Sequence, residues 1–167
     1  SGNFFLPEPD DEVVVGFMNE DPGHPIILGG VYGERHKPPY EYEAKNNMKA
    51  IVTREKMRIE FNEEKKVITI STPGKNTVEI SDDDKHIKLT DQNKNEIVMN
   101  SSGISLLSAK DIILKAKGAI TMDATSKFSA TAKQDVSLEG LNVNMQAKVS
   151  AVVKGNAKAE LSASGQT

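Results

Sequence analysis

Two polar clusters in the middle of the chain carry side chains that could bind a divalent cation. The first is the acidic run Asp82, Asp83 and Asp84, which His86 follows two residues later. Carboxylate oxygens are the ligands that calcium and magnesium prefer, so this run is a candidate cation site. A short run of like charges is more often a solvated surface, and we interpret this one as an acidic corner exposed to water.

The second cluster, Asp91-x-Asn93-x-Asn95, has the spacing that opens a calcium-binding EF-hand loop. The sixth position of such a loop must be Gly to allow a sharp turn, and the twelfth is a Glu that binds the ion through both oxygens. Here those positions are Glu96 and Ser102. We therefore predict that this cluster is not an EF-hand.

The remaining residues with chemical potential form no known pattern. His24, His36 and His86 are far apart in the sequence and the chain has no Cys, so no zinc-binding pair is formed. Neither a Gly-rich phosphate loop nor a Gly-x-Ser-x-Gly nucleophile motif occurs. We interpret Gly29-Gly30 as a bulge or close-packing position in a strand. The sequence thus predicts no catalytic, cofactor-binding or metal-binding residue, and a protein that is not an enzyme.

The most regular element of the chain is a repeat of eight residues in the segment 104–167. Within each unit, alternate positions are large, large, small and polar, and the third is always Ser, Ala or Gly. The parity slips once, by one residue, near Gly140. The large positions are Ile104, Leu106, Ile112, Leu114, Ile120, Met122, Phe128, Val136 and Leu138 before the slip, and Val143, Met145, Val153 and Leu161 after it. Ala130, Ala151 and Ala159 occupy the remaining large positions; the last small position is Ala163, and the last unit ends at Gly165.

Alternation at i and i+2 is typical of strands, because successive side chains of a strand point to opposite faces. A helix would place its apolar stripe at i+3 and i+4, which this pattern does not do. A fixed period of this kind marks a repeat architecture. We predict about eight short strands, each followed by a tight corner at a small residue.

The composition is too poor in large apolar residues for one chain to enclose a core in this segment. The chain has no Trp, 5% aromatic residues and 37% hydrophobic residues, many of them Ala. Ordering each residue costs about 1–2 kcal/mol of backbone entropy, which buried apolar area must offset. We therefore expect several chains to share one thin axial core. The net charge of −3 gives no argument for nucleic acid, and we find neither a membrane-spanning run nor a signal peptide.

The first part of the chain has a different organisation. Residues 12–17 and 26–32 are predicted strands, joined by a turn rich in Gly and Pro. Two strands cannot form a stable domain alone, so we expect residues 1–33 to be the C-terminal part of a larger barrel. Residues 34–55 are predicted as a neck or linker. Residues 56–103 are predicted as five further strands with longer polar corners, before the octads of 104–167.

Residues 7–17, 21–32, 37–41 and 45–47 together resemble the end of the oligonucleotide/oligosaccharide-binding (OB) fold and neck of VgrG-type spike proteins. Such proteins belong to type VI secretion and other contractile injection systems and are similar to the tail spikes of contractile-tailed phages. Two residues depart from the family pattern. Asp10 stands where the family often has Gly, and Glu20 stands where a Gly often precedes the Asp-Pro pair, here Asp21-Pro22. The large hub region that usually precedes this barrel is absent from the sequence.

The resemblance implies an all-β fold in which the end of an OB-like barrel is followed by an intertwined trimeric β-helix, a β-prism needle. It implies a homotrimer that punctures the target envelope and contacts the membrane only transiently. The implied partners are a PAAR-type tip protein, effectors, and a tube protein bound through the missing hub. It also implies assembly in the bacterial cytoplasm followed by ejection. A β-helical polysaccharide-degrading enzyme and a passive adhesin or fibre stalk are the alternatives.

Overall fold

The computed structural model describes Gly2 and residues 4–163, and its strands all form antiparallel pairs. The chain divides into two units, Ser1–Leu114 and Lys115–Thr167, which are considered separately. The described residues contain one short 3-10 helix, η1 (Met18–Glu20), and no α-helix. In this part of the chain, no helix has the length and apolarity needed to cross a membrane. The prediction of an all-β chain is therefore confirmed.

Strands β1 (Val13–Phe17) and β2 (Pro25–Gly30) form an antiparallel hairpin, as the sequence predicts. The register shifts between Val14 and Val15, which pair with Gly29 and Ile27, so Leu28 has no direct partner. This irregularity lies beside Gly29 and supports the interpretation of the Gly pair as a bulge position.

The backbone conformation at two further positions of this segment agrees with the Gly that the family often has there. Asp10 and Glu20, which stand where the family often has Gly, have φ values of 73° and 60°. Positive φ is the region that Gly adopts at little cost and that other residues enter with strain.

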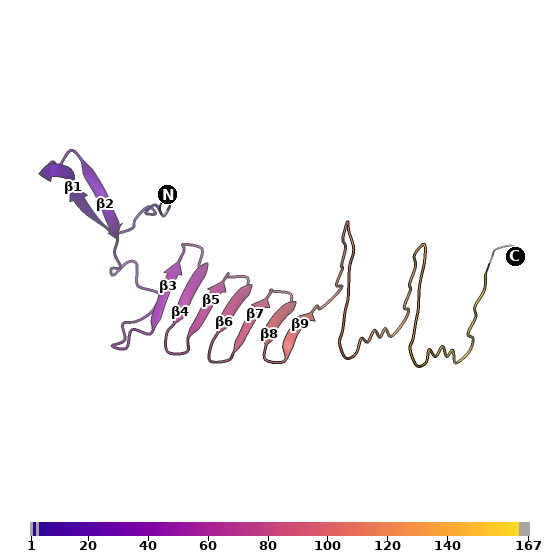
Figure 1. The fold of residues 1–167 in the computed structure, drawn as a ribbon. Coiled ribbons are helices and arrows are strands. Elements are labelled where there is room, and N and C mark those ends of the chain that lie inside the picture. Colours follow the sequence, from indigo (N-terminus) through magenta and orange to yellow (C-terminus); the bar gives the residue numbers. More distant parts are fainter. Residues whose placement is uncertain (1, 3, 164–167) are drawn as a thin grey trace. The chain divides into compact units, whose positions relative to one another are not determined.

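A second sheet has seven strands, each paired with its neighbours in sequence order (Figure 1). Its strands are β3 (Met48–Val52), β4 (Arg58–Asn62), β5 (Val67–Ser71), β6 (Thr77–Ser81), β7 (His86–Thr90), β8 (Glu96–Asn100) and β9 (Gly103–Leu107). The five strands predicted in residues 56–103 are present. Strand β3 lies within residues 34–55, so the prediction of a linker is wrong over Met48–Val52. The alternation of this strand is weak because Lys49 and Ile51 share one face.

The sheet is built from tandem units of nineteen residues, the hairpin repeats, which the sequence analysis missed. Residues 48–66 and 67–85 each comprise a strand, a five-residue turn, a second strand and a four-residue turn, and residues 86–102 repeat this with a shorter last turn. In five of these turns a Lys has positive φ, between 50° and 68°. They are Lys56, Lys66, Lys75, Lys85 and Lys94, with φ values of 62°, 50°, 65°, 52° and 68°.

The octads give a different result. Strand β9 includes the start of the first unit, and from residue 108 to 163 the structure assigns no strand. The backbone instead bends at a regular interval, at residues 109–110, 117–118, 125–126, 133–134, 141, 148–149 and 156–157. The interval is eight residues except between 141 and 148, where it is seven. The predicted period and its slip near Gly140 are thus present as bends, whereas the predicted strands beyond Leu107 are not formed in the single chain. Gly165 lies outside the described residues.

No hydrophobic side chain is buried anywhere in the described part of the chain. Its one buried polar residue is Ser81, which is 3% exposed. Large octad side chains such as Ile112, Phe128 and Met145 are 57%, 64% and 79% exposed. A single chain therefore has no core of its own, as the composition predicts.

Candidate functional site: the apolar face of the seven-stranded sheet

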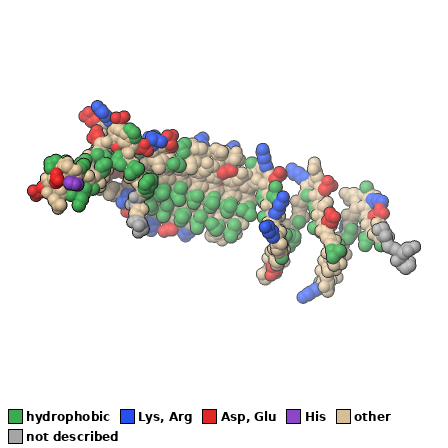
Figure 2. Space-filling view, turned by 90° about the horizontal axis from the view of Figure 1, so that it is seen from above, with side chains coloured by type: hydrophobic (Ala, Val, Ile, Leu, Met, Phe, Trp, Pro, Cys, Tyr) green, Lys and Arg blue, Asp and Glu red, His purple; other side chains and the backbone are tan. Residues whose placement is uncertain are grey.

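One face of the seven-stranded sheet carries two continuous columns of apolar side chains. Alternate residues of a strand share a face, and the strand register brings them into line across the sheet. The first column consists of Ile51, Ile59, Ile70, Val78, Leu89, Ile97 and Leu106, and the second of Phe61, Ile68, Ile80, Ile87, Met99 and Ile104. Figure 2 shows hydrophobic side chains in rows along the sheet.

These side chains shield each other along the columns, but no other segment among the described residues covers them. Ile59, Ile68 and Leu89 remain 36%, 37% and 37% exposed although they lie in the middle of a sheet. Complete burial of a side chain of this size stabilises a structure by about 1.5–3 kcal/mol relative to full exposure. A contiguous apolar face of this extent is typical of an interaction surface.

The face is hollowed near β7, β8 and β9. A groove of about 430 Å³ runs over this part of the sheet, and its apolar lining includes Val78, Leu89, Ile97, Leu106 and Ile112. Ile112 belongs to the second octad. The groove therefore continues the first apolar column of the hairpin repeats into the start of the octads.

Asn residues at the same position of successive repeats connect one turn to the next. The Asn76 side-chain oxygen accepts the Gln92 N–H at 3.1 Å. Nineteen residues later, the Asn95 side-chain oxygen accepts the Ala109 N–H at 3.0 Å and the Ser108 hydroxyl at 3.1 Å. These bonds tie turns along one edge of the sheet and fix the spacing of neighbouring hairpins.

The cluster that resembled a calcium loop is itself a closed turn. The Asp91 carboxylate accepts the N–H groups of Asn93 and Asn95, both at 2.8 Å, and the side-chain amides of the same two residues at 3.2 Å and 2.8 Å. The backbone bond from Asn95 is the main reason why the pKa of Asp91 is lower than usual. The Asp91 carboxylate is therefore engaged by hydrogen bonds within the turn.

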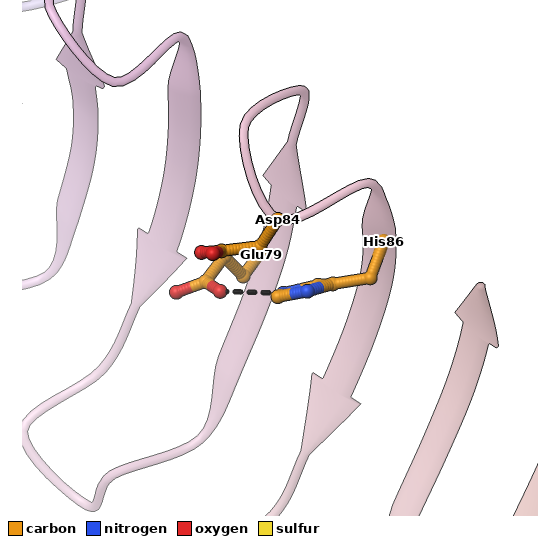
Figure 3. A group of neighbouring side chains, drawn as sticks. All are labelled: Glu79, Asp84 and His86. Carbon is orange, nitrogen blue, oxygen red and sulfur yellow. Dashed lines mark hydrogen bonds and ion pairs between the residues drawn. The ribbon is translucent and has the colours of Figure 1, made fainter. Parts of the chain in front are cut away.

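The opposite face of the sheet is polar, and there the structure brings together part of the predicted acidic corner. Glu79, Asp84 and His86 have side-chain ligand atoms within 4.8 Å of one another (Figure 3). Nε2 of His86 lies 2.7 Å from Oε1 of Glu79. Asp82 and Asp83 are not part of this group. Sequence reasoning missed Glu79, which lies on β6 and reaches His86 diagonally across the β6–β7 pair.

The other two histidines lie apart from this group. Nδ1 of His24 is 2.9 Å from the Asp21 carboxylate in the turn between β1 and β2. The pKa of Asp21 is lowered, first by the Gly23 N–H and then by His24. For His36 the structure gives a backbone bond, in which its carbonyl accepts the Gly33 N–H. Among the described residues, Glu79, Asp84 and His86 form the single group of three potential metal ligands.

Comparison with known families supports the interpretation of both regions. Residues 1–32 match the type VI secretion system/phage-baseplate injector OB domain, and residues 67–149 match the phage baseplate V C-terminal trimerisation domain. The two matches support a VgrG-like spike family. A search of curated proteins found no significant match.

The bounds of the second match coincide with features of the structure. It begins at the first residue of β5 and ends at a bend of the octad segment, at residue 149. It therefore runs across Gly103, where the sequence analysis placed a domain boundary. The match thus covers β5 to β9 together with the octads as far as residue 149, and a match to a trimerisation domain supports a homotrimer.

Proposed function

We propose that this chain forms the trimeric, cell-puncturing needle of a contractile injection apparatus. The observation that carries the proposal is the pair of uncovered apolar columns on the seven-stranded sheet, in a segment that matches a trimerisation domain. Three copies of a face two side chains wide can meet about one axis and cover both columns. The result is a narrow β-prism whose core is shared between chains.

The octads support the same assembly for a second reason. Backbone N–H and C=O groups need partners wherever water is excluded, and residues 108–163 form no strand pairs within one chain. Neighbouring chains in an intertwined β-helix supply these partners. A closed β-structure of this kind has no free lateral edge, which suits a rod that bears an axial load.

In this proposal the needle is driven by a contracting sheath through the target envelope. It touches the membrane transiently, and it carries a PAAR-type tip protein and effectors. A hub upstream of the OB segment joins it to the tube protein. The assembled spike forms in the cytoplasm and is ejected with the apparatus.

An enzyme that degrades polysaccharides fits the structure less well. Such enzymes place two carboxyl groups at a set separation and bind sugars on aromatic platforms. The one aromatic residue within the strands of the seven-stranded sheet is Phe61, and it lies in the apolar columns. The polar face therefore offers no aromatic platform to a glycan.

The molar mass in solution tests the proposal directly. One chain has a mass of 18.2 kDa, so light scattering coupled to size exclusion should give three times that value, about 55 kDa. A monomeric mass over the micromolar range would contradict the proposal. Co-purification with a PAAR-type tip protein would distinguish a needle from a passive fibre stalk, which shares the fold but carries no such tip.

A further inference from the structure

We propose that Glu79, Asp84 and His86 form a zinc-binding site on the polar face of the sheet. His nitrogen and Asp or Glu oxygen are both ligands of Zn²⁺, and three protein ligands with water as the fourth make an open four-coordinate site. Their ligand atoms lie within 4.8 Å of one another and come from β6, the β6–β7 turn and β7 (Figure 3). The apolar columns are on the other face, so the site stays accessible in the trimer proposed above.

The geometry requires only small side-chain movements to accept the ion. Zinc binds His nitrogen and carboxylate oxygen at about 2.0–2.2 Å, so two ligands of a tetrahedral site lie roughly 3.3 Å apart. Nε2 of His86 and Oε1 of Glu79 are 2.7 Å apart. A rotation that opens this pair by about half an ångström admits the metal between them, so that Nε2 and the Glu79 carboxylate both bind the ion instead of each other.

Asp84 is held toward the site by the one buried polar residue of the described chain. The Ser81 hydroxyl oxygen accepts the Asp84 N–H at 3.0 Å, and the hydroxyl lies 3.4 Å from Oδ2 of Asp84. Ser81 is 3% exposed, so its orientation is constrained by its surroundings. Outer contacts of this kind orient metal ligands and contribute to affinity.

The surroundings leave room for the ion and its water. Glu79 and Asp84 open onto a hollow of about 240 Å³, which Glu60 and Lys65, of opposite charge, also line. Lys88 is paired with Glu79 in the strand register, but its ammonium group lies 2.7 Å from a carboxylate oxygen of Glu96. Glu79 is thus directed to His86.

The repeat itself does not require these three residues. At the equivalent junction of the first and second repeats the corresponding residues are Glu60, Lys65 and Val67. At the junction of β8 and β9 the turn is two residues shorter, and Val98 and Gly103 occupy the strand positions. The donor set is specific to the β6–β7 junction.

Zinc uptake by the full chain tests the site. Protein stripped with a chelator and dialysed against ZnCl₂ should retain one zinc per chain, measured by elemental analysis. His86→Asn and Asp84→Asn should each abolish this retention. Asp82→Asn, with the same loss of charge in the same turn, and His24→Asn should leave it unchanged. Equal retention by His86→Asn and the wild type would overturn the proposal.

Two measurements remain informative if a ligand variant fails to fold. In the wild type, zinc should shift the side-chain nitrogen resonances of His86 and not those of His24 or His36; no saturable shift at His86 would overturn the proposal. Ser81→Ala should keep the stoichiometry while it weakens zinc affinity about tenfold, as expected of a positioning residue. Unchanged affinity in that variant would contradict the role assigned to Ser81.

Discussion

The hairpin repeats and the octads both alternate apolar and polar residues, yet they differ in where their backbone partners come from. In residues 48–107 each strand is followed by a turn that returns the chain antiparallel to itself, so every strand pairs with its sequence neighbour. From residue 108 to 163 the interval between bends is eight residues or seven, and no strand pairs form within the chain. Both regions leave their apolar side chains uncovered.

This difference shows that a hairpin satisfies its hydrogen bonds locally but does not by itself create a core. The hairpin repeats need other chains to cover one face, whereas the octads need other chains for both the backbone and the side chains. We infer that the hairpin repeats retain secondary structure as isolated chains more readily than the octads do.

The largest effect is expected from a charge in an apolar column. Ile97→Asp places a carboxylate in the first column once in every chain, and burial of an unpaired charge costs several kcal/mol. We expect light scattering to give a monomeric mass. The adjacent Val98→Asp lies on the polar face opposite Lys88 and should keep the trimeric mass. Loss of the trimer in both variants would refute the assignment of the two faces.

A matched pair in the octads should give a smaller but clear effect. Ile120→Asp replaces a large position of the repeat, and Thr121→Asp replaces the next residue, which points the other way in a strand. We expect Ile120→Asp to lower the melting temperature of the trimer and Thr121→Asp to change it little. Similar melting temperatures for the two variants would argue against an inward face at the even positions.

The contacts between turns should contribute about 1–3 kcal/mol where an Asn side chain reaches the next turn. Asn95→Ala removes the bonds to Ala109 and Ser108 and one bond to Asp91. Asn93→Ala, in the same turn, removes a side-chain bond to Asp91 alone. Denaturant unfolding should show a greater loss of stability for Asn95→Ala. Equal losses would mean that the contacts between turns contribute nothing.

The smallest effect is expected at the turn lysines. Lys94 has a φ of 68°, and Gly at this position removes the strain of a side chain in the left-handed region. We expect Lys94→Gly to raise the free energy of unfolding by up to about 1 kcal/mol. Lys117 lies at an octad bend without positive φ, so Lys117→Gly should not stabilise the protein. A gain in both variants would show that the two kinds of corner are alike.

The sequence predicted much of the fold because alternation and period are local properties. The strands of residues 56–103, the hairpin near the N-terminus and the phase slip near Gly140 all follow from the spacing of side chains along the chain. The positive φ of Asp10 and Glu20 agrees with the Gly that the resemblance led us to expect there. Strand β3 escaped prediction because Lys49 interrupts its apolar face.

The apolar side of the strands within residues 56–103, the eight-residue period of the octads and the lack of a core in one chain all follow from the sequence alone. Only the tertiary structure decided which strands are neighbours and in what register they lie. That register places Glu79 beside His86 and turns isolated apolar pairs into two columns. The physical reason is that cross-strand contacts depend on the length and handedness of each turn, which side-chain alternation does not encode.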